Sequence, residues 1–220
     1  MYLISKYISS QTDVKVIISG EGADVLFGGY LYFRYAPNNQ AYRAEIVKLL
    51  RELHLYDCLR ADRTTAVHGL EIRPPFLDKD LIDVVMNCSS LTTNKTTTKK
   101  LLRNAMSKYN VLPNEILWGK KEAFSDAVGL SWMDSIGKYA TDVLNMKENQ
   151  DAVLNFTGSP YITPFNDTAK LFQMLFESHF DTSWHVLYKL WLPNQQWVKT
   201  GGEPSARVLD VYNENSQNEN

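Results

Sequence analysis

The first part of the chain carries apolar residues in two different periods. Residues 2–10 place them at helical spacing, so that one face of a helix would be apolar. Residues 14–19 instead form a short apolar run rich in β-branched side chains, which predicts a buried strand. A helical pattern begins at residue 23 and meets the pair Gly28-Gly29, which predicts a break. The pattern therefore indicates a helix, a strand and a broken helix in succession.

Helical patterns dominate the residues that follow. The stretch 41–69 is amphipathic and ends at Gly69, a residue suited to a helix C-terminus. Residues 78–88 and 97–109 predict further helices. No second strand is convincing before residue 110, and one parallel strand cannot form a sheet. We therefore expect a mostly helical α/β fold with an incomplete parallel sheet, whose missing strands come from outside this sequence or from another chain.

Composition excludes several classes of protein. The 220 residues are 44% hydrophobic and carry a formal net charge of -2. They can bury a sizeable core, and they have no bulk positive field for nucleic acid or an anionic membrane. No stretch approaches the roughly 20 apolar residues of a membrane span. Cys58 and Cys88 fit neither a disulfide framework nor metal-ligand spacing, which favours a reducing compartment. We expect a cytoplasmic protein that binds neither nucleic acid nor membrane.

Glu21 stands between two glycines directly after the predicted strand. Ligands of open α/β sheets bind beyond the carboxyl ends of the strands, where a glycine-rich turn lets backbone N–H groups approach them. In such a place Glu21 could act as a base or bind an amine or a metal, and Asp24 would reach the same pocket. The alternative is a plain glycine turn with a solvated acid, because a single G-x-G pattern is a weak signal.

Two further segments concentrate charge. Acids and bases alternate in residues 57–78, where Asp57 and Arg60 stand three apart. On a helix these two could form an ion pair or together meet a charged ligand. In residues 118–129 two lysines stand beside an acid in a predicted loop, and lysine suits the phosphates of a nucleotide. The alternatives are a salt-bridged helix surface for the first segment and a solvated turn for the second.

Three stretches of the chain carry a family resemblance: "SGEGADVLFGGYLYFRYAPN", "LRADRTTAVHGLEIRPPFLD" and "LPNEILWGKKEAFSDAVGLSW". They resemble the synthetase domain of glutamine-hydrolysing asparagine synthetases, which has an ATP-pyrophosphatase fold. The resemblance covers residues 1–208 as the C-terminal part of that domain and leaves 209–220 as a disordered polar tail. It implies a carbon-nitrogen ligase that makes asparagine from aspartate, ATP and ammonia through β-aspartyl-AMP, with Mg2+ accompanying the ATP. The ammonia would come from glutamine hydrolysed in an N-terminal amidotransferase domain.

The resemblance also implies roles for individual residues. Glu21 matches a glutamate thought to take a proton from the attacking ammonia, and Lys121 matches a lysine that contacts phosphate. Asp57 matches an acid near the pyrophosphate and Mg2+ site, so it is expected to contact the metal indirectly. The positions expected to bind ATP, AMP or aspartate are Ser19, Gly20, Gly22, Asp24, Asp57, Arg60 and Arg73.

The sequence departs from the family's pattern at several points. Ala23, Val25, Pro74 and Gly119 stand where the family usually has Ser, Glu, Val and Arg. The pyrophosphate loop of the form S-G-G-x-D-S-S and the glutaminase domain are both absent from this sequence.

Three interpretations therefore stay open. In the first, the chain is part of an active ligase, completed by the missing N-terminal half as a domain or a separate chain. In the second, it is a non-catalytic regulatory or binding module. In the third, it amidates or cyclises another carboxylate, as β-lactam synthetases do. The retained Glu21, Asp24 and Lys121 favour the first, and a homodimer is one further form that the protein could take.

Overall fold

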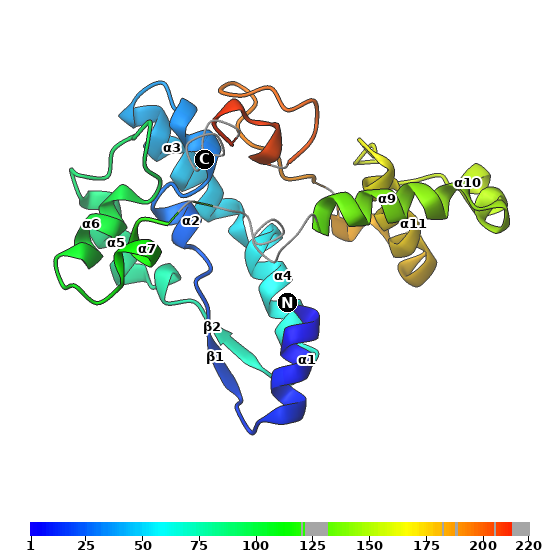
Figure 1. The fold of residues 1–220 in the computed structure, drawn as a ribbon, viewed down its shortest axis with the longest axis horizontal. Coiled ribbons are helices and arrows are strands. Elements are labelled where there is room, and N and C mark those ends of the chain that lie inside the picture. Colours follow the sequence, from blue (N-terminus) through cyan, green and yellow to red (C-terminus); the bar gives the residue numbers. More distant parts are fainter. Residues whose placement is uncertain (120, 122–131, 182, 188, 205, 213–220) are drawn as a thin grey trace. The chain divides into compact units, whose positions relative to one another are not determined.

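The chain forms two compact units in this computed structural model, which describes residues 1–119, 121, 132–181, 183–187, 189–204 and 206–212 (Figure 1). Unit 1 comprises Met1–Lys121 with Gln196–Val198 and Leu209–Asn220. Unit 2 comprises Glu122–Gln195 with Lys199–Val208. Each unit is described by itself.

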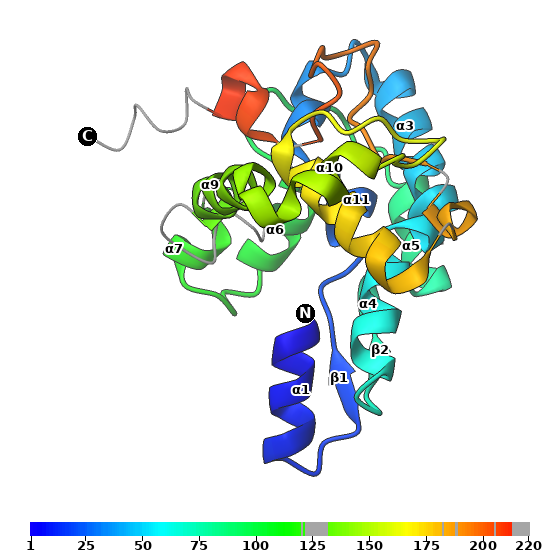
Figure 2. The ribbon, with the colours of Figure 1, turned by 90° about the vertical axis from the view of Figure 1, so that its right-hand side faces the viewer.

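A short parallel sheet lies in unit 1, formed by strands β1 (Val16–Ile18) and β2 (Glu71–Arg73). Helix α4 (Asp57–Ala66) packs against β2, and helix α1 (Tyr2–Gln11) packs against α4. Figures 1 and 2 show these four elements together. The expected fold class, mostly helical with a small parallel sheet, is therefore confirmed.

Two expectations about this sheet are wrong. The partner of β1 lies within the chain, because β2 pairs with it and places Ile72 opposite Ile17. The three residues of β2, Glu-Ile-Arg, include one apolar side chain, so their pattern carries no signal of a strand. Nor is β1 buried, since Ile18 is 79% exposed and Val16 is 39% exposed. Most of the Ile18 residue is therefore open to solvent.

The core of unit 1 lies around helix α2 (Ala23–Leu26), in which Leu26 is fully buried. The following 3-10 turn, Leu31–Tyr35, buries two aromatic side chains. One of them, Tyr32, has its ring 5.9 Å from the ring of Trp197. The break predicted at Gly28-Gly29 is confirmed, because Gly28 takes a positive φ of 60° directly after the helix. The loop after β1 thus leads into a firmly packed helix.

The amphipathic stretch predicted at 41–69 forms two helices. Helix α3 (Asn39–Glu52) is capped by the side chain of Asn38, and a 3-10 turn follows at Leu53–Leu55. Tyr56, with φ -129° and ψ -95°, then leaves the helical conformation before α4 begins. Because of this break, α4 has a first turn of its own, which carries charged residues of the candidate site.

Helices α5 (Lys79–Asn87), α6 (Lys100–Ser107) and α7 (Asn114–Leu117) continue unit 1. The side chain of Asp78 caps α5 by accepting two backbone N–H bonds, directly after a 3-10 turn at Pro75–Leu77. The helices predicted at 78–88 and 97–109 are confirmed, although the second begins at Lys100.

Unit 2 is built on two helices that pack together, α9 (Trp132–Asn145) and α11 (Asp167–Phe180), with α10 (Gln150–Asn155) beside α9. The hydroxyl of Thr141 donates to an oxygen of Asp167 at 2.7 Å and joins the two long helices. Short 3-10 turns lie at Lys147–Asn149, Trp184–Leu187 and Ala206–Val208. No helix in the described part of either unit is long and apolar enough to cross a membrane.

The predicted tail at 209–220 is described only in its first four residues, of which Leu209 is buried. Its remaining residues, 213–220, lie outside the described residues. The boundary after residue 208 and the disorder of the tail stay predictions.

Candidate active site

The loop after β1 places Glu21 at the carboxyl end of the strand. The backbone N–H of Glu21 donates to the hydroxyl of Ser19 at 3.2 Å, and Gly22 follows with a φ of 89°. A Cβ atom at position 22 would lie 2.3 Å from Cδ2 of Leu77, whereas one at Gly20 would meet nothing within 4 Å. Gly22 therefore serves the turn and its packing, and the loop is open on the side of Gly20.

Arg60 of α4 links two carboxylates beside this loop. Its Nη2 donates to Oε1 of Glu21 at 2.8 Å and lies 3.1 Å from Oδ1 of Asp57. The hydroxyl of Tyr30 donates to the other oxygen of Asp57 at 2.9 Å. Of the two possibilities left open for Asp57 and Arg60, an ion pair or a shared charged ligand, the structure shows the ion pair. The same arginine also reaches the glutamate of the loop, a contact between segments far apart in the sequence.

Burial shifts the pKa of two groups in this network, Glu21 and Tyr30. Burial raises the pKa of Glu21, the charge of Arg60 opposes the rise, and the negative charges of Asp57 and Asp24 add to it. Burial, together with the charge of Asp57, also raises the pKa of Tyr30 above its ordinary value. Tyr30 therefore stays a hydrogen-bond donor. Glu21 binds a proton more readily than a free carboxyl does, which is the direction that a general base near neutral pH requires.

A second charged cluster surrounds Asp24 in the first turn of α2. Oδ1 of Asp24 is 3.0 Å from Nζ of Lys99 and 3.7 Å from Nζ of Lys121. The two lysine side chains are 22% and 19% exposed, so solvent screens their charges only in part. Two ammonium groups and one carboxylate leave one excess positive charge, which suits an anionic ligand. Lys120 and residues 122–129 of the predicted lysine loop lie outside the described residues.

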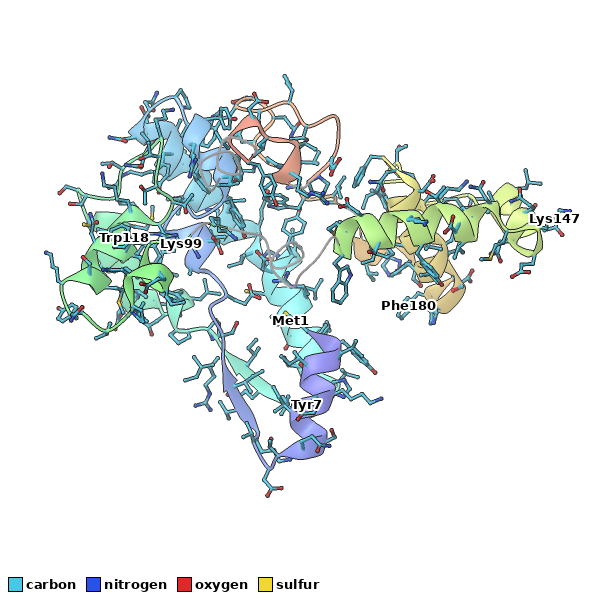
Figure 3. All side chains as sticks on the ribbon, in the orientation of Figure 1. Met1, Tyr7, Lys99, Trp118, Lys147 and Phe180 are labelled. Carbon is cyan, nitrogen blue, oxygen red and sulfur yellow. The ribbon has the colours of Figure 1, made fainter. Side chains whose placement is uncertain are left out.

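Lys99 and Tyr30 are site residues that the sequence did not single out. Lys99 takes a φ of 54°, in the left-handed region that residues other than glycine rarely adopt. Figure 3 shows it next to α2, which carries its partner Asp24. The signal in the sequence was a lysine pair at the start of an amphipathic helix. A lysine pair alone does not indicate a binding site, and only the fold shows that the Asp24 carboxylate faces Lys99.

Arg73 belongs to neither cluster. Its backbone oxygen accepts a hydrogen bond from the N–H of Ser19 at 3.0 Å, at the end of the strand pair. Its Nε, however, donates to Glu71 at 2.6 Å, and its side chain is 64% exposed. The ligand-binding role expected for Arg73 stays a prediction.

The described residues do not form a metal site by themselves. Among them, no group of three or more His, Cys, Asp and Glu side chains could hold a metal ion. Asp57, which was expected near Mg2+, has both oxygens engaged by Tyr30 and Arg60. The indirect contact with Mg2+ that was expected of Asp57 stays a prediction.

Positive charge gathers near the glycine-flanked acid at the carboxyl end of a parallel strand. Arg60 binds Glu21 and two lysines lie beside Asp24, an arrangement that suits an anionic ligand in an α/β fold. The family model described as asparagine synthase matches residues 1–52 and 35–193. The chain belongs to the asparagine synthase family, as the resemblance predicted.

Three relatives show how far the similarity extends. The chain is 40% identical over 217 residues to the human and mouse proteins named asparagine synthetase (glutamine-hydrolyzing). It is 40% identical over 219 residues to the chicken protein of the same name. Each comparison covers 96% of this chain and 38% of the relative. The chain therefore spans well under half the length of these relatives.

Proposed function

We propose that this chain forms part of the active site of an ATP-dependent carbon-nitrogen ligase that converts aspartate to asparagine. The convergence of Glu21, Asp24, Arg60 and Lys121 at the carboxyl end of β1 carries the proposal, because these residues come from three distant segments. Membership of the asparagine synthase family and the names of the relatives support the reaction.

In the first step, the β-carboxylate of aspartate attacks the α-phosphorus of ATP, β-aspartyl-AMP forms and pyrophosphate leaves. The ammonium groups of Lys99 and Lys121 lie 3.0 Å and 3.7 Å from the same atom, Oδ1 of Asp24. Their charges would bind phosphate oxygens and offset the negative charge that develops on the departing pyrophosphate. The open space at Gly20 leaves room for the nucleotide to approach the loop.

In the second step, ammonia attacks the acyl carbon of the intermediate. A carbon-nitrogen bond forms, the bond to AMP breaks, and one proton is released. Glu21 would accept that proton, and burial tunes its pKa in the direction that this role needs. Arg60 holds the Glu21 carboxylate at 2.8 Å, and Asp57 holds Arg60 in turn.

The remaining parts of the reaction belong to segments that this sequence does not contain. The match covers 38% of the human relative and leaves about 62% of that protein unmatched. We assign the phosphate-binding loop and the glutamine-hydrolysing domain to this unmatched part, present either as a domain of a longer protein or as a separate chain. In this proposal ammonia comes from glutamine, ATP with Mg2+ is the co-substrate, and the protein acts in the cytoplasm.

The test is aspartate-dependent pyrophosphate release with ATP, Mg2+ and ammonium at saturating concentrations. It uses the 220-residue chain and the same chain joined to the upstream segment of the human relative. Release should fall about 100-fold in Lys121→Ala, because one lost contact to developing charge costs about 3 kcal/mol. Lys48→Ala is the matched control, since Lys48 pairs with Glu45 at 3.4 Å on helix α3.

The outcomes separate the interpretations. Equal release by wild type and Lys121→Ala would rule out the phosphate contact. No release from either preparation, with both folded, would favour the non-catalytic module instead.

A further inference from the structure

Arg103 of helix α6 binds the backbone on both sides of the lysine cluster. Its Nε donates to the carbonyl oxygen of Thr98 at 2.9 Å, and its Nη2 donates to that of Gly119 at 3.0 Å. Its Nη1 donates to the carbonyl oxygen of Leu117. One guanidinium group therefore holds three carbonyl groups from two segments.

The two segments are those that carry the lysines. Thr98 directly precedes Lys99, and Gly119 stands two residues before Lys121. A guanidinium is planar and presents its donors in a rigid fork, so it fixes the spacing between the groups that it binds. The fold thus places one rigid group between the two chain segments whose ammonium groups share Asp24.

The backbone near both lysines is constrained. Lys99 takes a φ of 54°, a conformation that costs a residue with a Cβ atom about 1 kcal/mol and persists only where its surroundings hold it. At Gly119 a Cβ atom would lie 2.8 Å from the carbonyl oxygen of Glu115, so the turn before Lys121 is closely packed on its own helix. Burial lowers the pKa of Arg103 while the charge of Asp24 opposes the change, which agrees with a half-buried guanidinium close to the cluster.

We infer that Arg103 is a positioning residue that sets the separation and direction of Lys99 and Lys121. The consequence for catalysis rests on the proposed function, in which the lysines bind phosphate. Three of the five N–H donors of Arg103 bind backbone carbonyl groups, so the role inferred for it is to hold the backbone and not to bind the substrate. Without Arg103, an anion would have to order both lysine side chains when it binds, and the entropy lost in that ordering would weaken binding.

The first measurement is the rate at which an acetylating reagent at limiting concentration modifies each lysine, followed by mass spectrometry. In the 220-residue chain, Arg103→Gln should raise the rates at Lys99 and Lys121 about threefold or more relative to Lys48, because both become more accessible. Arg103→Lys keeps one cationic donor and should give a smaller rise.

The matched control is Arg43→Gln. Arg43 of helix α3 also donates to two backbone carbonyl groups, those of Met86 at 2.6 Å and Cys88 at 2.5 Å. These carbonyl groups lie at the end of helix α5 and carry neither site lysine. Its loss should leave the rates at both site lysines unchanged. A general loosening of the fold would raise the rates in this control as well.

The second measurement is the affinity for inorganic pyrophosphate, which should fall about tenfold in Arg103→Gln. Unchanged modification of both lysines in a folded Arg103→Gln would overturn the inference, and so would a rise at one lysine alone. If Arg103→Gln fails to fold, Arg103→Lys decides the matter by the same criterion. A rise at both lysines without any loss of pyrophosphate affinity would uphold the positioning role and refute the phosphate contact of the proposed function.

Discussion

Gly29→Ala should disturb the Asp24 cluster from the backbone side. A Cβ atom at position 29 would lie 2.1 Å from Oδ1 of Asp24, 2.5 Å from Cε of Lys99 and 2.9 Å from Cα of Asp24. The carboxylate and the lysine arm could rotate away from the new methyl group. The Cα atom could not, so the chain between α2 and the following turn would have to shift.

The expected loss of stability follows from these contacts. Forcing a methyl group into a packed site costs about 1–3 kcal/mol. Losing part of the Asp24–Lys99 ion pair, whose side chains are 28% and 22% exposed, costs up to about 1 kcal/mol more. We expect Gly29→Ala to lower the free energy of unfolding by about 2–3 kcal/mol.

The assay is urea-induced unfolding followed by circular dichroism, with Gly20→Ala as the matched control. A Cβ atom at Gly20 would meet nothing within 4 Å, and Gly20 has no positive φ. Its unfolding free energy should stay within about 0.5 kcal/mol of wild type. A Gly29→Ala variant as stable as Gly20→Ala would refute the reasoning, because the close approach of the backbone would then carry no energetic cost.

Three further outcomes can be measured. Because burial raises the pKa of Glu21 above 4.5, the folded state binds that proton more tightly than the unfolded state, and stability should fall as pH rises from 4.5 through the raised value. In Glu21→Gln the free energy of unfolding in urea should no longer fall across that pH range, and a complete enzyme with this change should form no amide. If the variant is less stable than wild type at neutral pH, the contact with Arg60 outweighs the cost of burying the Glu21 carboxylate. Ile18→Lys should reduce self-association in light scattering, since this side chain is 79% exposed on β1. Gly137→Ala should stabilise helix α9 by about 0.5–1 kcal/mol in thermal unfolding, because the added methyl group makes only an ordinary contact, 3.9 Å from Thr168; a lower unfolding temperature would contradict it.

Local patterns predicted the elements that depend on neighbouring residues. The spacing of apolar residues located α1 and α5, and the glycine pair located the end of α2. The sequence did not predict strand β2, because a three-residue strand with one apolar side chain is defined by its pairing partner and not by its own pattern. The exposure of β1 was not predicted either. A run of apolar residues favours burial, but it does not show whether another segment of the chain will cover it.

The site divides in the same way. The sequence by itself determined the chemistry of each short segment, with Glu21 between glycines and Asp57 one helical turn before Arg60. Only the tertiary structure decided that Arg60 reaches Glu21 and that Lys99 and Lys121 share Asp24. These contacts join segments far apart in the chain, and their distances are set by how the helices pack around a common core. Local spacing encodes the period of one element and not the distance between two.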